Sequence, residues 1–150
     1  MTDQTSARLA LPLLQPGQAQ KELYHNEALV LLDLAVQPVV DSLGLNAPPP
    51  SPALGQAWIV GATPAGAWAG QAGAIAGWTG GGWRFVAPLE GMTVWSIADA
   101  RPARHRGGAW QLAPLPAIAP PQGGETIDSP ARAAIGAILA ALAAHGLIAP

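Results

Sequence analysis

The sequence predicts an α+β protein in which an N-terminal helix, a small Trp- and Gly-rich antiparallel β module and a C-terminal helix follow one another. Two observations predict it. All six tryptophans lie between residues 54 and 112 on a glycine-rich, nearly uncharged background, and both flanks of that segment have helical patterns. Because Trp is large and rigid, Trp set among glycines forms either the core of a small sandwich or barrel-like domain or a flat binding surface.

The composition indicates a chain that shares part of its surface with other subunits. At 150 residues, one domain is the default. Only 11% of the residues are charged, against roughly 25% in an ordinary domain. The net charge of −2 argues against a general nucleic-acid partner, and the lack of cysteine excludes disulfides and thiolate metal sites.

Neither a leader peptide nor a membrane span is expected. Asp3 and the lack of a basic run before the apolar stretch 9–14 argue against a signal peptide. The apolar run 133–144 is too short to cross a bilayer. We therefore expect a protein that is assembled in the cytoplasm without membrane insertion.

The first element is a helix expected over residues 18–37, within an N-terminal helical docking segment, 1–46. Pro16 and Gly17 mark a turn before it, and Pro38 ends it. Apolar residues at helical spacing predict a core-facing stripe. The stripe consists of Tyr24, Ala28, Leu31, Leu32 and Ala35.

After a Pro-rich stretch at 46–52 we place the β module, residues 53–113. Trp78 and Trp83 flank the sequence Thr-Gly-Gly-Gly, which predicts a hairpin with a four-residue loop and a cross-strand Trp pair. Further strands are expected at 57–60, 92–97 and 109–112.

The strand at 92–97 places Thr93, Trp95 and Ile97 on one face. A basic cluster follows it, made of Arg101, Arg104, His105 and Arg106. The cluster is either a solvated loop or a contact for a phosphate or an acidic sugar.

A Pro-rich linker, 114–127, leads to the C-terminal segment 128–150, which we interpret as an oligomerisation helix. Asp128 or Ser129 suits the N-cap. Pro130 then suits the first turn and Gly146 the C-terminal end of the helix.

The apolar residues of this helix alternate at spacings of four and three, as in a coiled-coil seam. The seam includes Ile135, Ile138 and Leu142, the candidate oligomerisation residues. Ile at both kinds of seam position favours trimers, so we expect a trimeric bundle. The helix of a single packed domain would show the same stripe, and that alternative stays open.

No catalytic constellation stands out. Glu90 and Asp99 are the carboxylates of the β module, with no sign that they face each other across a sugar. His25, His105 and His145 lie in different segments without ligand-like spacing. We therefore expect a non-enzyme with no metal and no cofactor.

The remaining chemistry is recognition. Trp78, Trp83 and Trp95 are the candidate carbohydrate-binding residues, because an exposed indole face stacks on the C–H surface of a sugar. The opposing interpretation is that most of these tryptophans fill the core, since a module with few Leu and Phe must fill its interior with something.

Several short blocks stand out along the chain. They are PGQAQKE at 16–22, HNEA at 25–28, LD at 32–33, GQAWIVG at 55–61, GAWAG at 66–70, AGW at 76–78, GGWRF at 81–85 and PLEG at 88–91. With the tail 129–148, these blocks resemble a family of uncharacterised function that occurs in phage tail-fibre and head-spike proteins and in gene transfer agents. The resemblance covers roughly residues 11–112 and the tail.

The resemblance implies a homotrimeric structural component of a phage or gene-transfer-agent-like particle. It would be a spike, a fibre or a fibre-base protein, attached to other particle proteins and in contact with cell-surface polysaccharide, and its location would be the virion or particle. The residues leave open one alternative of another class, a monomeric carbohydrate-binding module. A small hydrolase is the weakest candidate because it lacks a site.

Overall fold

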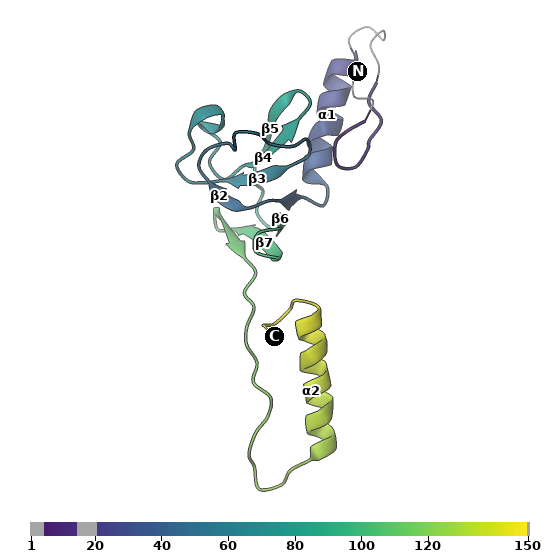
Figure 1. Ribbon diagram of the computed structural model, residues 1–150, viewed down its shortest axis with the longest axis vertical. Coiled ribbons are helices and arrows are strands. Elements are labelled where there is room, and N and C mark those ends of the chain that lie inside the picture. The colour runs from purple at the N-terminus through teal and green to yellow at the C-terminus, as the bar shows by residue number, and fades with distance from the viewer. Residues whose placement is uncertain (1–4, 15–20, 150) are drawn as a thin grey trace. The chain divides into compact units, whose positions relative to one another are not determined.

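The computed structural model of the protein describes residues 5–14 and 21–149, and the chain divides into two units, residues 1–112 and 113–150 (Figure 1). The first part of the helix expected over residues 18–37 therefore lies outside the described residues. The Pro-rich stretch at 46–52 does not separate the two units. The segment before it and the segment after it belong to the same β structure.

The described part of the N-terminal unit contains the helix α1 (Lys21–Ala35), the short 3-10 helix η1 (Gly66–Trp68) and strands that form two sheets. The strands are β1 (Val39–Val40), β2 (Leu43–Leu45), β3 (Ala57–Val60), β4 (Ile75–Thr79), β5 (Gly82–Val86), β6 (Thr93–Ser96), β7 (Arg101–Arg106) and β8 (Ala109–Leu112). The first sheet has the order β2-β3-β4-β5, and the second has the order β1-β6-β7-β8.

Both sheets are mixed, so the predicted antiparallel pairing holds only among the strands within residues 53–113. Strand β1 pairs with β6, and β2 pairs with β3, in parallel. The other neighbours are antiparallel. The physical reason is the segment 39–45, which the sequence places in the docking segment. It supplies one edge strand to each sheet and changes sheet between Val40 and Leu43.

The two sheets share one apolar core. Its buried residues come from both sheets and are Val40, Ala57, Ile59, Ile75, Val94 and Ala103. Strand side chains alternate between faces, so the intervening residues of β3 and β4 point the other way. The α+β class is confirmed, with two helices and two small sheets in the described residues.

Helix α1 does not bury the stripe that its apolar spacing predicts. Tyr24 is 82% exposed and Leu32 is half-exposed, whereas Asp33 and Leu34 are buried. A helix with apolar residues nearly all round gives periodicity little power to choose a face. The buried face of α1 is set instead by polar partners of Asp33 in the segment before the helix.

Most of the β-strand predictions are confirmed. The hairpin pairs Trp78 with Trp83 across β4 and β5. Its strands run on to Thr79 and Gly82, so the loop is the dipeptide Gly80–Gly81 rather than four residues. The basic cluster is not a loop, because it lies in strand β7.

The C-terminal unit contains α2 (Ser129–Ala144) after an extended segment (Figure 1). The Asp128 side chain accepts a hydrogen bond from the backbone N–H of Ala131, which confirms the predicted N-cap. Gly146 has φ +66° just past the helix, a conformation that glycine adopts without strain. The N–H of Ala149 donates to the carbonyl of Pro116, which ties the end of the chain to the extended segment.

Candidate functional site

Four of the six tryptophans form one cluster on the face of the first sheet that points away from the shared core. Trp68 is fully buried, and its ring centroid lies 6.2 Å from that of Trp58 and 5.1 Å from that of Trp83. The centroids of Trp78 and Trp83 are 5.0 Å apart. Tilted and edge-to-face rings at these distances attract one another beyond their apolar burial. The cluster is therefore a second small core, with Trp78 and Trp83 half-buried at its rim.

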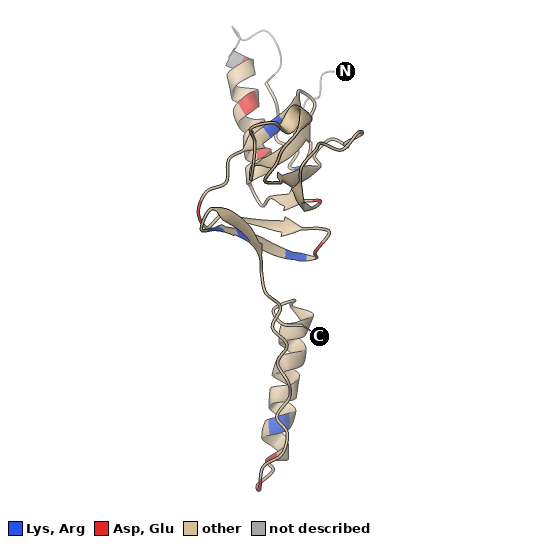
Figure 2. Ribbon diagram, turned by 90° about the vertical axis from the view of Figure 1, so that its left-hand side faces the viewer, with Lys and Arg blue, Asp and Glu red and all other residues tan. Residues whose placement is uncertain are grey.

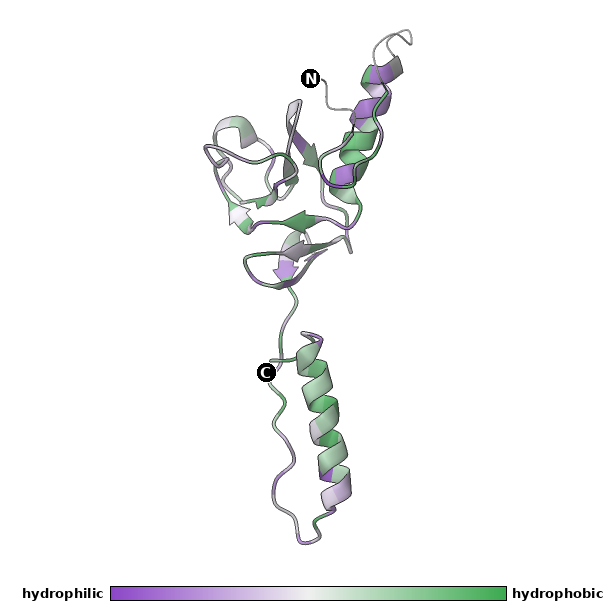
Figure 3. Cartoon of the chain, turned by 45° about the vertical axis from the view of Figure 1, so that its right-hand side comes forward, coloured by the Kyte–Doolittle hydropathy of each residue, from purple (hydrophilic) through white to green (hydrophobic). Residues whose placement is uncertain are grey.

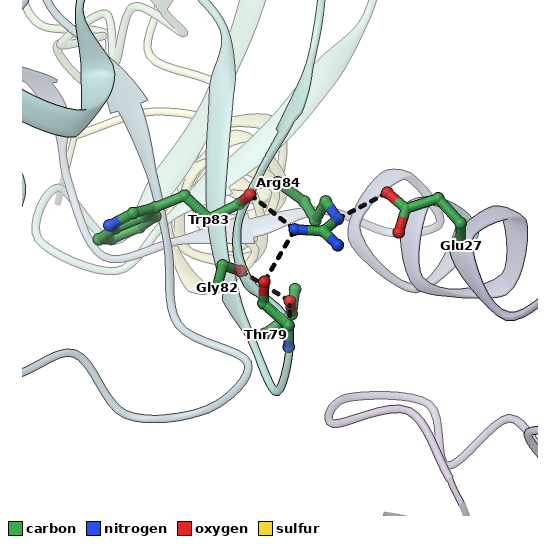
Figure 4. Close-up of polar contacts among 6 residues, drawn as sticks. Glu27, Thr79, Gly82, Trp83 and Arg84 are labelled. Atoms are coloured by element: carbon green, nitrogen blue, oxygen red, sulfur yellow. Dashed lines mark hydrogen bonds and ion pairs between the residues drawn. The ribbon is translucent and has the colours of Figure 1, made fainter. Parts of the chain in front are cut away.

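The hairpin that carries Trp78 and Trp83 is attached to α1 by an ion pair. Arg84 Nε lies 2.6 Å from Glu27 Oε1, and its Nη1 donates to the carbonyls of Gly81 and Trp83 (Figure 4). The Thr79 hydroxyl donates to the carbonyl of Gly82 at 2.7 Å. These bonds fix the tight turn and orient the hairpin against the helix.

A polar clasp holds the segment before α1. The buried carboxylate of Asp33 accepts hydrogen bonds from Ser6 Oγ at 2.8 Å, Arg8 N at 2.9 Å and Leu9 N at 2.6 Å. About two turns of helix away, the Asn26 side chain bonds both the N–H and the carbonyl of Leu14. A buried carboxylate is stable only with such donors, so the fold depends on this clasp.

A cavity of about 700 Å³ lies between this clasped segment, α1 and the β4–β5 hairpin. Its lining is mainly apolar, with Leu13, Val30 and Leu34 among the contributors. Glu27 and Arg84 also line it, but each already satisfies the other. Its lining therefore presents apolar surface, this satisfied ion pair and Glu22, whose buried Oε2 has no hydrogen-bond partner within the described residues.

The second sheet presents a different surface on its outer side. Trp95 is 45% exposed, and it makes none of the ring contacts found among the described residues. Arg104 and Arg106 are exposed on the neighbouring strand β7. Neither of their side chains has a hydrogen bond or ion pair within the described ranges 5–14 and 21–149. We call this surface, made of Thr93, Trp95, Arg104, Arg106 and Gln111, the outer face.

The structure separates residues that the sequence grouped together. Trp78 and Trp83 belong to the first sheet and Trp95 to the second, on faces that both point away from the shared core, so the three candidate carbohydrate-binding residues form no common platform. The basic cluster also splits, because side chains alternate along β7. His105 turns inward and stacks edge-on against Trp110, at a centroid distance of 5.4 Å.

The two carboxylates of the β module lie at opposite ends of β6. Glu90 accepts from the N–H of Gly107, and Asp99 accepts from Ser96 Oγ at 2.6 Å. Each is occupied in a turn, which gives no arrangement across a shared substrate. Where the structure describes the chain, it brings together no group of three His, Cys, Asp or Glu side chains that could hold a metal ion.

The candidate oligomerisation residues lie on α2. Ile135 and Ile138 are 42% and 59% exposed, and Leu142 is half-buried. Within the described residues, no helix has the length and apolar character needed to cross a membrane.

Comparison of the sequence with known proteins identifies a family. The model of a family of proteins of unknown function (DUF2793) matches residues 25–111, from the middle of α1 to the last strand of the second sheet. A search of curated proteins finds no match. Because the match spans more than half of its length, the chain belongs to this family of unknown function, DUF2793.

Proposed function

We propose that the protein is a structural spike, fibre or fibre-base protein of a phage or gene-transfer-agent-like particle. In this proposal it is a homotrimer through α2, contacts cell-surface polysaccharide through its β unit and performs no catalysis. The resemblance of its sequence blocks to phage and gene-transfer-agent proteins supports the particle, and the geometry of α2 supports the trimer.

The observation that carries the trimer is the exposure of α2. Of its sixteen residues, all within the described range 21–149, none is buried. Its single charged side chain is Arg132, and green, hydrophobic residues run along most of its length (Figures 2 and 3). An isolated helix of this length is marginal in water, and an apolar one needs a partner surface.

A second copy and a third copy of α2 would provide that surface. The Ile residues of the seam favour three strands, and a knobs-into-holes bundle would cover Ile135, Ile138 and Leu142 in each copy. Asp128 starts the helix with a firm cap, so the bundle would form from helices of defined length.

The test is the mass of the full-length chain in solution, by light scattering across a dilution series. We expect a mass of three chains per complex at micromolar protein concentration. A monomer at all concentrations would contradict the trimer and favour the second candidate, a monomeric carbohydrate-binding module, for which the exposed Trp95 is the supporting observation. Sub-micromolar glycan binding by such a monomer would decide for the module.

A further inference from the structure

The register of the second sheet brings an aromatic ring and two unpaired cations onto one face. Trp95 of β6 pairs with Pro102 of β7, and the next outward position of β7 is Arg104. Diagonal neighbours across an antiparallel pair stand about 7–8 Å apart at Cα, within reach of an aromatic ring and a long side chain. The outer face therefore places Trp95 beside Arg104.

Polar side chains flank Arg104 across the sheet, and the second cation lies farther along the same strand. Arg104 stands between Thr93 on β6 and Gln111 on β8. Arg106 follows on the same side of β7, about 6.7 Å farther along the strand. The face thus offers a ring, two planar guanidinium groups and two side chains that can donate and accept hydrogen bonds.

The charged side chains that the strands of this surface contribute are all basic. Strands β6, β7 and β8 contain no Asp or Glu, and Figure 2 shows basic residues along these strands with acidic residues at the turns. The carboxylates lie in the turns, where Glu90 accepts from the N–H of Gly107, next to Arg106, and Asp99 accepts from Ser96 Oγ. In a chain of net charge −2, this local basic patch runs against the overall balance.

We propose that the outer face binds an acidic polysaccharide, in which Trp95 stacks on one sugar ring while Arg104 and Arg106 hold carboxylates of the same glycan. Guanidinium groups match carboxylates with two parallel hydrogen bonds, and such charge-assisted bonds are about twice as strong as neutral ones. The inference rests on the proposed contact with cell-surface polysaccharide and adds the site and the charge class of the glycan.

A nucleic acid would use the same two kinds of contact, but the face fits it less well. Binding a phosphate backbone depends on many cations along a groove, whereas the outer face has two unpaired guanidinium groups. Each glycan contact on such an exposed face is weak, and three copies in one homotrimer would multiply their effect through avidity.

The experiment measures binding of the full-length chain to immobilised carboxymethyl-dextran and to unmodified dextran of the same length, with poly(U) RNA as a third surface. These two dextrans differ in carboxylates alone. We expect binding to carboxymethyl-dextran that weakens with salt, and at least about tenfold weaker binding to dextran and to RNA.

Four variants locate the site. Trp95→Ala and the double variant Arg104→Gln/Arg106→Gln should each weaken binding to carboxymethyl-dextran by about tenfold or more. The double variant Arg104→Lys/Arg106→Lys should lose less, because it keeps the charge but not the planar fork. Tyr24→Ala, which removes an aromatic ring exposed on α1, should leave binding unchanged.

A charge control carries the same change of net charge outside the face. Ala62→Glu/Gln122→Glu lowers the net charge by two, as the Arg-to-Gln double variant does, at two exposed positions, and should leave most of the binding intact. Equal loss in this control would show general repulsion rather than a site and would overturn the proposal.

The proposal is also overturned if the two dextrans bind equally, if neither binds, if RNA binds best, or if the Arg104→Gln/Arg106→Gln variant binds as well as the parent. The mass of each sample separates the two claims. A trimer that does not bind carboxymethyl-dextran would contradict only the proposal that the outer face binds an acidic glycan. A monomer that binds through Arg104 and Arg106 would contradict the proposed trimeric particle protein and still support glycan binding by the outer face.

Discussion

Leu34 of α1 lies directly against Gly77 of β4, and the contact exists because Gly77 has no side chain. A β-carbon at Gly77 would stand 2.6 Å from Leu34 Cδ1, far inside van der Waals contact. The same stretch of β4 and β5 carries the Trp78–Trp83 pair on its other face. The docking of α1 and the position of the Trp cluster are therefore linked through one glycine.

The variant Gly77→Ala should lower the free energy of unfolding by about 1–3 kcal/mol, because the new methyl group overpacks against buried Leu34. Urea denaturation followed by Trp fluorescence measures it, since all tryptophans lie in the N-terminal unit. Gly81→Ala is the matched control, as its β-carbon would meet only the flexible end of Arg84. In the double variant Gly77→Ala/Leu34→Ala the two losses should be less than additive; full additivity would contradict the contact.

Asp33→Asn should release the segment that precedes α1. The carboxylate accepts three hydrogen bonds in a site where the side chain is 3% exposed, and an amide of the same size cannot accept all three with equal strength. We expect a loss of about 2–3 kcal/mol and faster amide hydrogen exchange at Arg8 and Leu9. Asp41→Asn, where the side chain accepts a long hydrogen bond of 3.4 Å from Gln56 Nε2, should change neither.

Trp68→Ala and Trp95→Ala should differ sharply in stability. Trp68 is fully buried among rings, so its removal leaves a cavity and should cost about 3–5 kcal/mol. Trp95 is 45% exposed and should cost under about 1 kcal/mol. Thermal denaturation followed by circular dichroism compares the two, and equal losses would mean that Trp95 is also a core residue.

Glu27→Gln should weaken the attachment of the β4–β5 hairpin to α1 by about 0.5–1 kcal/mol. Its side chain and that of Arg84 are 42% and 30% exposed, so solvent screens the pair and limits its contribution. The effect should shrink at high salt. Glu125→Gln, on an exposed residue of the C-terminal unit, serves as control, and a loss that salt does not change would argue against an ionic origin.

Ile138→Asp should convert the expected trimer to monomers, because a charge in the seam would be buried without a partner. Ala140→Asp places the same carboxylate on the opposite side of α2, where it should leave the trimer intact. Light scattering of both variants at one concentration gives the answer. If both remain trimeric, the seam assigned to Ile135, Ile138 and Leu142 is wrong.

Local sequence was enough to predict the elements that depend on neighbours along the chain. The Trp-flanked glycines predicted the hairpin, because a two-strand turn is a local structure, and Asp128 with Pro130 and Gly146 predicted both ends of α2. Alternation predicted that Thr93 and Trp95 share one face of their strand, and the structure shows both exposed.

Candidate site residues were predicted less well, because a site depends on which strands become neighbours. The sequence grouped Trp95 with Trp78 and Trp83, and it treated Arg104 and His105 as one cluster. Membership of different sheets separates the first set, and alternation within β7 separates the second. The first depends on which strands pair, and the second was not visible before β7 was known to be a strand. The sequence did contain a signal for this strand. If residues 101–106 alternate, one face has Arg101, Ala103 and His105, and the other has Pro102, Arg104 and Arg106.

The sequence by itself determined the α+β composition, the hairpin and the capped C-terminal helix, since propensity, turn chemistry and capping act over a few residues. Only the tertiary structure decided that residues 39–45 join both sheets in parallel, that α1 buries its Asp33 side rather than its Tyr24 side, and that Trp95 shares a face with Arg104 and Arg106. The first two depend on partners that lie far away along the chain, as Glu27 does from Arg84, and the third depends on the register of β6 against β7.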